Sequence, residues 1–140
     1  MPLLDLASGN SLWRGVDYYK EDRVKDWDQK EPGTYSGTVQ GTELYQVHLD
    51  IAHPRRSTCS CAFAHGRRVI CKHMVAMYFT VVPGSYEDFL RQIETWEKED
   101  VEREEQHRKD LEKYVKSLSK TELQSQLLRF LIEREERKYW

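Results

Sequence analysis

Three cysteines and one histidine are the residues of this chain whose types and spacing are best suited to metal chemistry. One residue separates Cys59 from Cys61, and after nine further residues Cys71 and His73 repeat that spacing. Structural zinc sites are tetrahedral and are usually closed by four thiolate or imidazole ligands. These four side chains satisfy that requirement alone, so the sequence predicts one structural Zn²⁺ ion bound by Cys59, Cys61, Cys71 and His73.

Redox and catalytic roles fit the same residues less well. A Cys59 and Cys61 dithiol with Cys71 as resolving thiol would leave the position of His73 unexplained. A catalytic zinc keeps one coordination position open for water and needs an acid or base nearby. Four protein ligands close the predicted site, and residues 51–86 contain no Asp or Glu. We therefore expect no enzymatic activity and no small-molecule substrate.

Other histidines are weaker candidates for the metal. His65 lies between the two cysteine pairs, but Gly66 and two arginines follow it, which is typical of a loop tip. His48 falls on the polar face of a predicted strand and His53 in a turn. We interpret all three as exposed histidines that do not bind the ion.

The elements that must position the ligands change in type along the chain. Leu12, Val16 and Tyr19 recur at helical spacing, which predicts a helix over 11–22. Alternating residues predict an antiparallel sheet with strands near 23–28, 35–40 and 43–51, and Gly41-Thr42 suggests a two-residue hairpin turn. Extended backbone at 57–61 would place Cys59 and Cys61 on one side, and a helix over 71–82 would point His73 back toward Cys71.

The remainder of the chain is predicted to be a charged helical tail. From Ser85 an apolar stripe gives way to residues 97–110, whose only apolar member is Val101, so this helix should run through solvent. Ser119 to Glu122 form a capping box that starts another helix. Its apolar side should be buried by a helical hairpin or by a partner, and it is formed by Leu123, Leu127, Phe130 and Leu131.

Together these patterns predict an α+β fold: an N-terminal helix, a small antiparallel sheet, a zinc knuckle with its following helix, and an extended C-terminal helical tail. We divide the chain into a lead-in (1–10), a zinc-binding domain (11–84, with its core at 57–80) and the tail (85–140). Three cysteines in a metal-like array indicate a reducing compartment, and no stretch is long enough to span a bilayer. A cytoplasmic location is expected.

Charge is distributed unevenly despite a net value of −2. Residues 1–50 carry nine acids and five bases, and residues 87–140 carry fifteen acids and twelve bases, whereas residues 51–86 carry five bases and no acid. This basic island could meet an anionic partner or could simply keep the module soluble. It consists of Arg55, Arg56, Arg67, Arg68 and Lys72. Five aromatic residues could form a stacking platform for nucleic acid or belong to the core: Tyr18, Tyr19, Trp27, Tyr35 and Tyr45.

The array Cys59-x-Cys61…Cys71-x-His73, with Lys72 inside the last triplet, resembles the SWIM-type zinc finger, and the likeness to bacterial members extends over residues 14–82. It includes the segment Gly15-Val16-Asp17-Tyr18-Tyr19 and the strand Val39-Gln40-Gly41-Thr42…Tyr45-x-Val47. This chain has Ala62 where those members often have proline, and Arg23 where they often have glycine. Neither departure involves a ligand.

The resemblance implies a zinc-binding interaction module, sometimes attached to a larger chain. Family members are generally proposed to bind DNA or other proteins. This chain has no P-loop, so any associated ATPase would lie elsewhere. We expect a protein partner first, and binding of DNA or RNA through the basic island is the alternative.

Overall fold

The structure, a computed structural model, describes residues 2–138, so Met1 of the lead-in and the last two residues of the tail lie outside it. Its contacts divide the chain into two compact units, residues 1–90 and 91–140. The predicted boundary at residue 84 lies slightly earlier, because the start of the long helix after Ser85 packs in the first unit, where Phe89 is buried.

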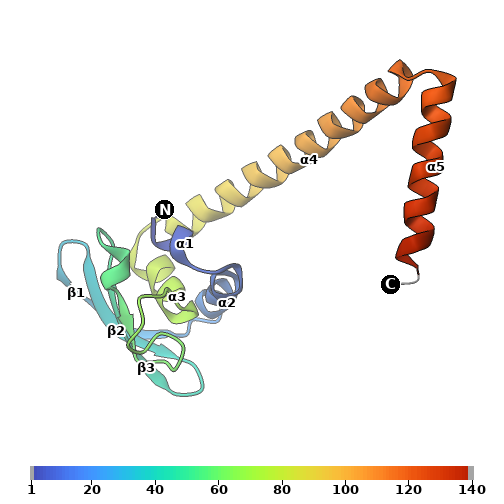
Figure 1. Ribbon diagram of the computed structural model, residues 1–140. Coiled ribbons are helices and arrows are strands. Elements are labelled where there is room, and N and C mark those ends of the chain that lie inside the picture. The colour runs from blue at the N-terminus through green and yellow to red at the C-terminus, as the bar shows by residue number, and fades with distance from the viewer. Residues whose placement is uncertain (1, 139–140) are drawn as a thin grey trace. The chain divides into compact units, whose positions relative to one another are not determined.

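The first unit contains a four-stranded antiparallel sheet in the order β1-β2-β3-β4 (Figure 1). Three strands agree with the predicted ones to within a few residues, and the fourth is very short. Val39, Val47 and Leu49 on the inner face are almost completely buried, as the alternation in this region predicts. The bounds are β1 Val24–Glu31, β2 Thr34–Gln40, β3 Leu44–Asp50 and β4 Thr58–Cys59.

The turn between β2 and β3 differs from the prediction. Gln40 pairs with Leu44, so the loop contains three residues rather than the two expected. The N–H of Gly41 donates to the carbonyl oxygen of Glu43 at 2.8 Å. The prediction was wrong because glycine in first position is also compatible with longer hairpin loops.

One apolar helix forms the centre of the first unit. Helix α3 (Lys72–Val81) lies between the sheet and helix α2 (Gly9–Lys20), so the unit has three layers (Figure 1). Eight of its ten residues are buried. A helix that is apolar on every side needs such a position. The helix that carries His73 is therefore also the core of the domain.

The predicted lead-in is partly wrong, because residues 2–6 fold as helix α1 (Pro2–Leu6). Leu3 and Leu4 are only 1% and 6% exposed, and Ala7 forms a parallel bridge with Ile70 just before the second ligand pair. A five-residue helix is too short to show a period in the sequence. Its burial comes from contact with distant residues, including the 3₁₀ helix η1 (Pro54–Arg56).

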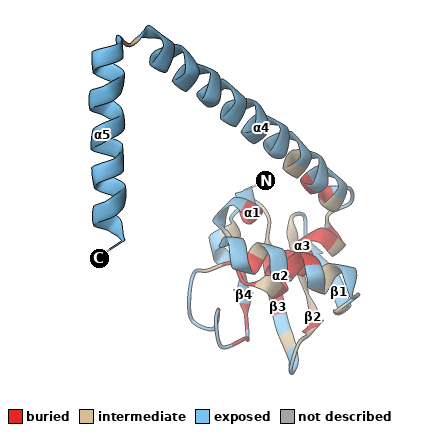
Figure 2. Cartoon of the chain, turned by 90° about the vertical axis from the view of Figure 1, so that its right-hand side faces the viewer, coloured by how far each residue is buried: buried red, intermediate tan, exposed pale blue. Residues whose placement is uncertain are grey.

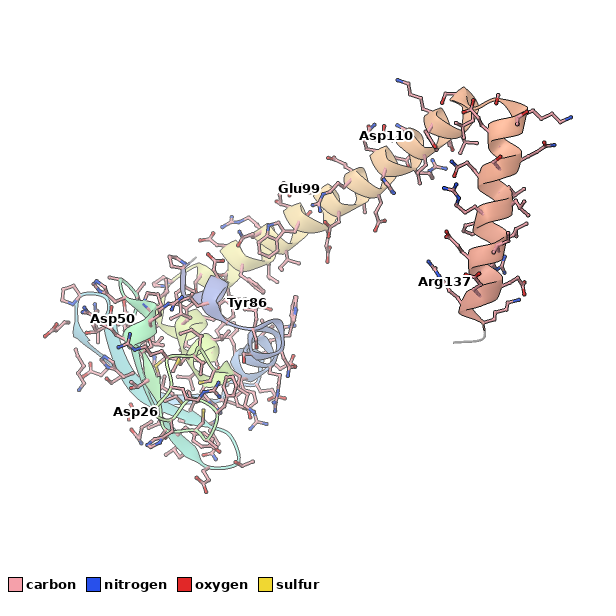
Figure 3. The ribbon with its side chains drawn as sticks, viewed as in Figure 1. Asp26, Asp50, Tyr86, Glu99, Asp110 and Arg137 are labelled. Atoms are coloured by element: carbon pink, nitrogen blue, oxygen red, sulfur yellow. The ribbon has the colours of Figure 1, made fainter. Side chains whose placement is uncertain are left out.

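The tail consists of helices α4 (Ser85–Ser117) and α5 (Lys120–Arg137). As predicted, Ser119 caps α5: its Oγ accepts a hydrogen bond from the N–H of Glu122 at 3.2 Å. Figure 2 shows that burial on α4 is confined to its first turns and that α5 is exposed along its length. Side chains stand outward around both helices, as the labelled Glu99 and Arg137 illustrate (Figure 3).

The contact between α2 and α3 depends on a glycine. A Cβ on Gly15 would overlap the side chain of Val75 and lie 3.0 Å from the carbonyl oxygen of Lys72. We expect Gly15→Val to lower the free energy of unfolding by about 1–3 kcal/mol, because the helices must separate to admit the side chain. Urea denaturation measures this change.

The control for this prediction is Gly9→Val in the same helix, where an added Cβ meets no atom within 4 Å. Valine has a slightly higher helix propensity than glycine, so this variant should be as stable as the parent protein or slightly more stable. Equal destabilisation by the two substitutions would contradict the assigned helix contact.

Candidate metal centre

The structure brings the four predicted ligands together. One donor atom from each of Cys59, Cys61, Cys71 and His73 can be chosen so that all four lie within 4.8 Å of one another, and all four residues are buried. The three cysteines are reduced rather than paired in a disulfide. Among the described residues, this is the one group of Cys, His, Asp or Glu side chains that could hold a metal ion.

Three elements deliver these side chains. Pairing of β3 with β4 places Cys59 opposite Val47, and a tight turn follows in which His65 donates its N–H to the carbonyl oxygen of Cys61 at 2.9 Å. Cys71 has extended backbone as the N-cap of α3, and His73 follows in the first turn. As predicted, the thiols of Cys59 and Cys61 converge on one site and the imidazole of His73 points back toward Cys71, but the strand ends at Cys59 instead of extending to residue 61.

The distances fit a tetrahedral zinc ion. Nδ1 of His73 lies 3.6 Å from Sγ of Cys59 and 3.7 Å from Sγ of Cys71. Tetrahedral bonds of about 2.3 Å to sulfur and about 2.0 Å to nitrogen place those atoms about 3.5 Å apart. The four side chains form one structural zinc site, and Nδ1 is the ligand atom of the imidazole.

One of the thiols, that of Cys71, is polarised toward the form that binds metal. The hydrogen bond from the Cys59 thiol, assisted by His73, lowers the pKa of Cys71 to about 4 although burial opposes this. The same contact and burial raise the pKa of Cys59. Since thiolates are the zinc ligands, the lowered pKa of Cys71 favours the form that binds metal.

Comparison with known proteins agrees with this geometry. Residues 45–81 match the SWIM zinc finger family, and this range contains all four ligands, β4 and α3. Residues 45–81 are identified as a SWIM zinc finger. No curated protein and no solved structure shows significant similarity to the chain.

The SWIM finger is completed by aromatic residues that lie upstream of its ligands. The ring of Tyr45 lies 4.5 Å from that of His73, and the ring of Tyr18 lies 5.5 Å from it. A Cβ on Gly41 would lie 3.2 Å from Nε2 of His73, so the β2–β3 loop also touches the imidazole. The two upstream segments on which the family resemblance rests therefore meet at the zinc ligand.

The second nitrogen of the zinc-binding histidine has an unusual environment. Nε2 of His73 is buried and has no hydrogen-bond partner among the residues that the structure describes. With Nδ1 on zinc, Nε2 carries the proton and faces the tyrosine rings and Gly41. Packing, rather than a carboxylate or carbonyl partner, holds the imidazole of the SWIM finger in place.

His48, His53 and His65 are outside the ligand cluster, as predicted, but His48 is half-buried rather than exposed. His65 is exposed in the turn after Cys61. His48 shares a hydrogen bond of 2.9 Å between its Nδ1 and the hydroxyl of Ser36 in the sheet. His53 is exposed and lies at the entrance to the 3₁₀ helix η1.

The basic island is divided in two. Four of its residues, Arg55, Arg56, Arg67 and Arg68, line one open cavity of about 960 Å³. Lys72 instead lies with its Nζ 5.0 Å from the centre of the Tyr18 ring and lines a separate cleft of about 300 Å³ beside Cys61 and Cys71. The five residues were grouped because they are close in sequence. In the folded chain, Lys72 lines a different cavity from the four arginines.

The five aromatic residues do not form one platform. Tyr18 and Tyr45 contact His73, whereas Tyr19 packs between Phe79 and Tyr86. Trp27 is 44% exposed and contacts Tyr35 on the sheet. None of the five is fully buried: the four tyrosines are half-buried and Trp27 is exposed, so neither the core nor the single-platform interpretation describes the whole set. None of the helices described is both long and apolar enough to cross a bilayer.

Proposed function

We propose that this chain is a non-enzymatic protein-interaction module in which zinc maintains the folded domain and the tail helix α5 docks on a partner. The observation that carries this proposal is that no described residue of α5 is buried, although six of them are large and apolar. Their exposed fractions range from 38% to 61%, and they are Leu123, Leu127, Leu128, Phe130, Leu131 and Ile132.

The arrangement of these residues supports a docking face. Leu123, Leu127, Phe130 and Leu131 follow the spacing that aligns side chains on one side of a helix. We call these four residues the α5 face. Contiguous exposed apolar surface of this kind is rare on monomers and is typical of an amphipathic helix that binds in a groove of a partner.

A non-catalytic role for the zinc is supported by the site itself. Four protein side chains occupy the coordination positions of a tetrahedral ion, which leaves none for a substrate or an activated water. The finger also has no Asp or Glu between residues 51 and 86 that could act as a general base. A reducing compartment such as the cytoplasm would keep the thiols available.

The α5 face can be tested by capturing partners from native cell extract. Leu127→Glu with Leu131→Glu should remove the proteins that the parent chain retains, because two buried apolar contacts would become charged. The expected loss is at least about tenfold, measured by quantitative mass spectrometry after nuclease treatment.

A matched control places the same charge elsewhere on α5. Ser125→Glu with Gln126→Glu also adds two carboxylates but changes polar positions. This variant should retain the same proteins. Equal capture by the parent chain and the Leu127 and Leu131 variant would refute docking through the α5 face.

Binding of nucleic acid is the second candidate, favoured by the four arginines that line one cavity. If all four contacted phosphates, the logarithm of affinity for duplex DNA should fall against the logarithm of salt concentration with a slope of about −4. Fluorescence anisotropy at several salt concentrations measures this slope. A flat response, or no binding at low salt, would eliminate this candidate.

A further inference from the structure

The cavity of about 960 Å³ is lined by arginines from two segments of the chain. Arg55 and Arg56 come from the 3₁₀ helix η1, and Arg67 and Arg68 come from the loop between Cys61 and Cys71. We call the cavity lined by these four residues the arginine groove. Helix α1 lines another part of it through Pro2, Asp5 and Leu6. We propose that the arginine groove binds an acidic segment of another protein, one that combines several carboxylates with an apolar side chain.

The four guanidinium groups retain capacity for an anionic partner. All four arginines are exposed, so an anionic partner can reach their side chains. Arg67 is positioned by its own loop: its Nη1 donates to the carbonyl oxygen of Phe63 at 3.2 Å, and its Cζ lies 5.2 Å from the Phe63 ring centre. Arginine forms two parallel hydrogen bonds to one carboxylate, which suits this chemistry.

The other lining residues favour a protein segment over nucleic acid. No Phe, Tyr or Trp lines the groove, whereas grooves for single-stranded nucleic acid usually stack bases on such rings. Pro2, Leu6 and Pro54 provide apolar surface that an apolar side chain could cover and a phosphodiester backbone could not.

The zinc site determines where half of the groove lies. Arg67 donates its N–H to the carbonyl oxygen of Ala64 at 3.0 Å, and Ala64 donates to that of Cys61 at 3.2 Å. Thr58, which also lines the groove, directly precedes Cys59. The loop and the strand are thus joined through zinc ligands, so groove binding should require metal whereas the α5 face should not.

The test uses the full-length zinc-bound protein and a fluorescent peptide that repeats Glu-Glu-Leu four times. Fluorescence anisotropy should show binding of this peptide and not of its Gln-Gln-Leu counterpart. Arg55→Gln with Arg68→Gln should weaken binding about tenfold, since each exposed arginine contact contributes modestly. The control, Arg14→Gln with Lys25→Gln, removes the same charge from exposed residues outside the groove and should leave affinity within about twofold.

Three results would overturn the proposal: no binding of the acidic peptide, an equal loss in the control variant, or tighter binding of a single-stranded oligonucleotide of matched charge. All four substituted residues are exposed and none is a ligand, so every variant should still bind zinc. Measuring the zinc content of each variant shows that its finger is intact. The outcome is independent of the proposed docking through α5, whose residues do not line this groove.

Discussion

Chelation of zinc is expected to unfold the finger core at residues 57–80. Structural zinc contributes an apparent binding free energy of about 10 kcal/mol or more, which is comparable with the whole stability of a small domain. In this chain the effect should extend into the central layer, because Cys71 caps α3 and eight of the ten α3 residues are buried. Amide hydrogen exchange with and without chelator measures the loss of protection segment by segment.

The tail provides an internal control for the chelation experiment. Helix α5 carries no ligand and has no buried residue, so its exchange should be the same in both states. Re-addition of one equivalent of zinc should restore protection in α3. Unchanged protection at residues 57–80 after verified metal removal would contradict the structural role of the ion.

Replacing the ligand histidine is expected to have the second largest effect. His73→Ala removes the imidazole that completes the site and leaves three thiols. Loss of a residue that hydrogen-bonds to a metal ligand, without binding the metal itself, typically lowers affinity ~10–100-fold. Loss of the ligand itself should lower zinc affinity by more than that. Competition with a chromophoric chelator measures the affinity. The variant should also lose thermal stability, because the vacated space lies between Tyr45 and Tyr18.

His65→Ala is the matched control for that substitution. His65 lies between the cysteine pairs but is exposed and outside the ligand cluster. Its removal should leave affinity and stability unchanged. The reverse pattern, loss of zinc in His65→Ala and retention in His73→Ala, would show that the wrong histidine has been assigned.

The zinc ligands and the main elements were predictable because their signals are local. The spacing of Cys59, Cys61, Cys71 and His73 matches the ligand number of zinc, and alternation around Val47 indicates a strand with one buried face. The capping box at Ser119 similarly fixes the start of α5 within a few residues. In each case, neighbours in sequence determine the outcome.

Other features depend on contacts between distant segments and could not be derived from spacing. Tyr18, Gly41 and Tyr45 surround His73 only after the helix and the hairpin pack together. Composition placed these tyrosines in one aromatic set without indicating which of them reach the metal site. Helix α1 was missed for the same reason, since Leu3 becomes core only through tertiary packing.

The separation of Lys72 from the four arginines is also a tertiary effect. All five residues lie in one acid-free stretch of sequence, which made them a single island. The finger loop carries Arg67 and Arg68 toward η1, whereas the start of α3 directs Lys72 to Tyr18. Charge counts therefore left two interpretations open, an anionic partner or solubility, and did not indicate the shape of the basic surface.

X-ray absorption spectroscopy at the zinc edge of the purified protein tests the central claim most directly. A closed structural site predicts three sulfur ligands at about 2.3 Å and one nitrogen ligand at about 2.0 Å. It also predicts no oxygen ligand, because Cys59, Cys61, Cys71 and His73 fill the tetrahedron. A spectrum with fewer than three sulfurs, or with a bound water oxygen, would contradict the closed structural site.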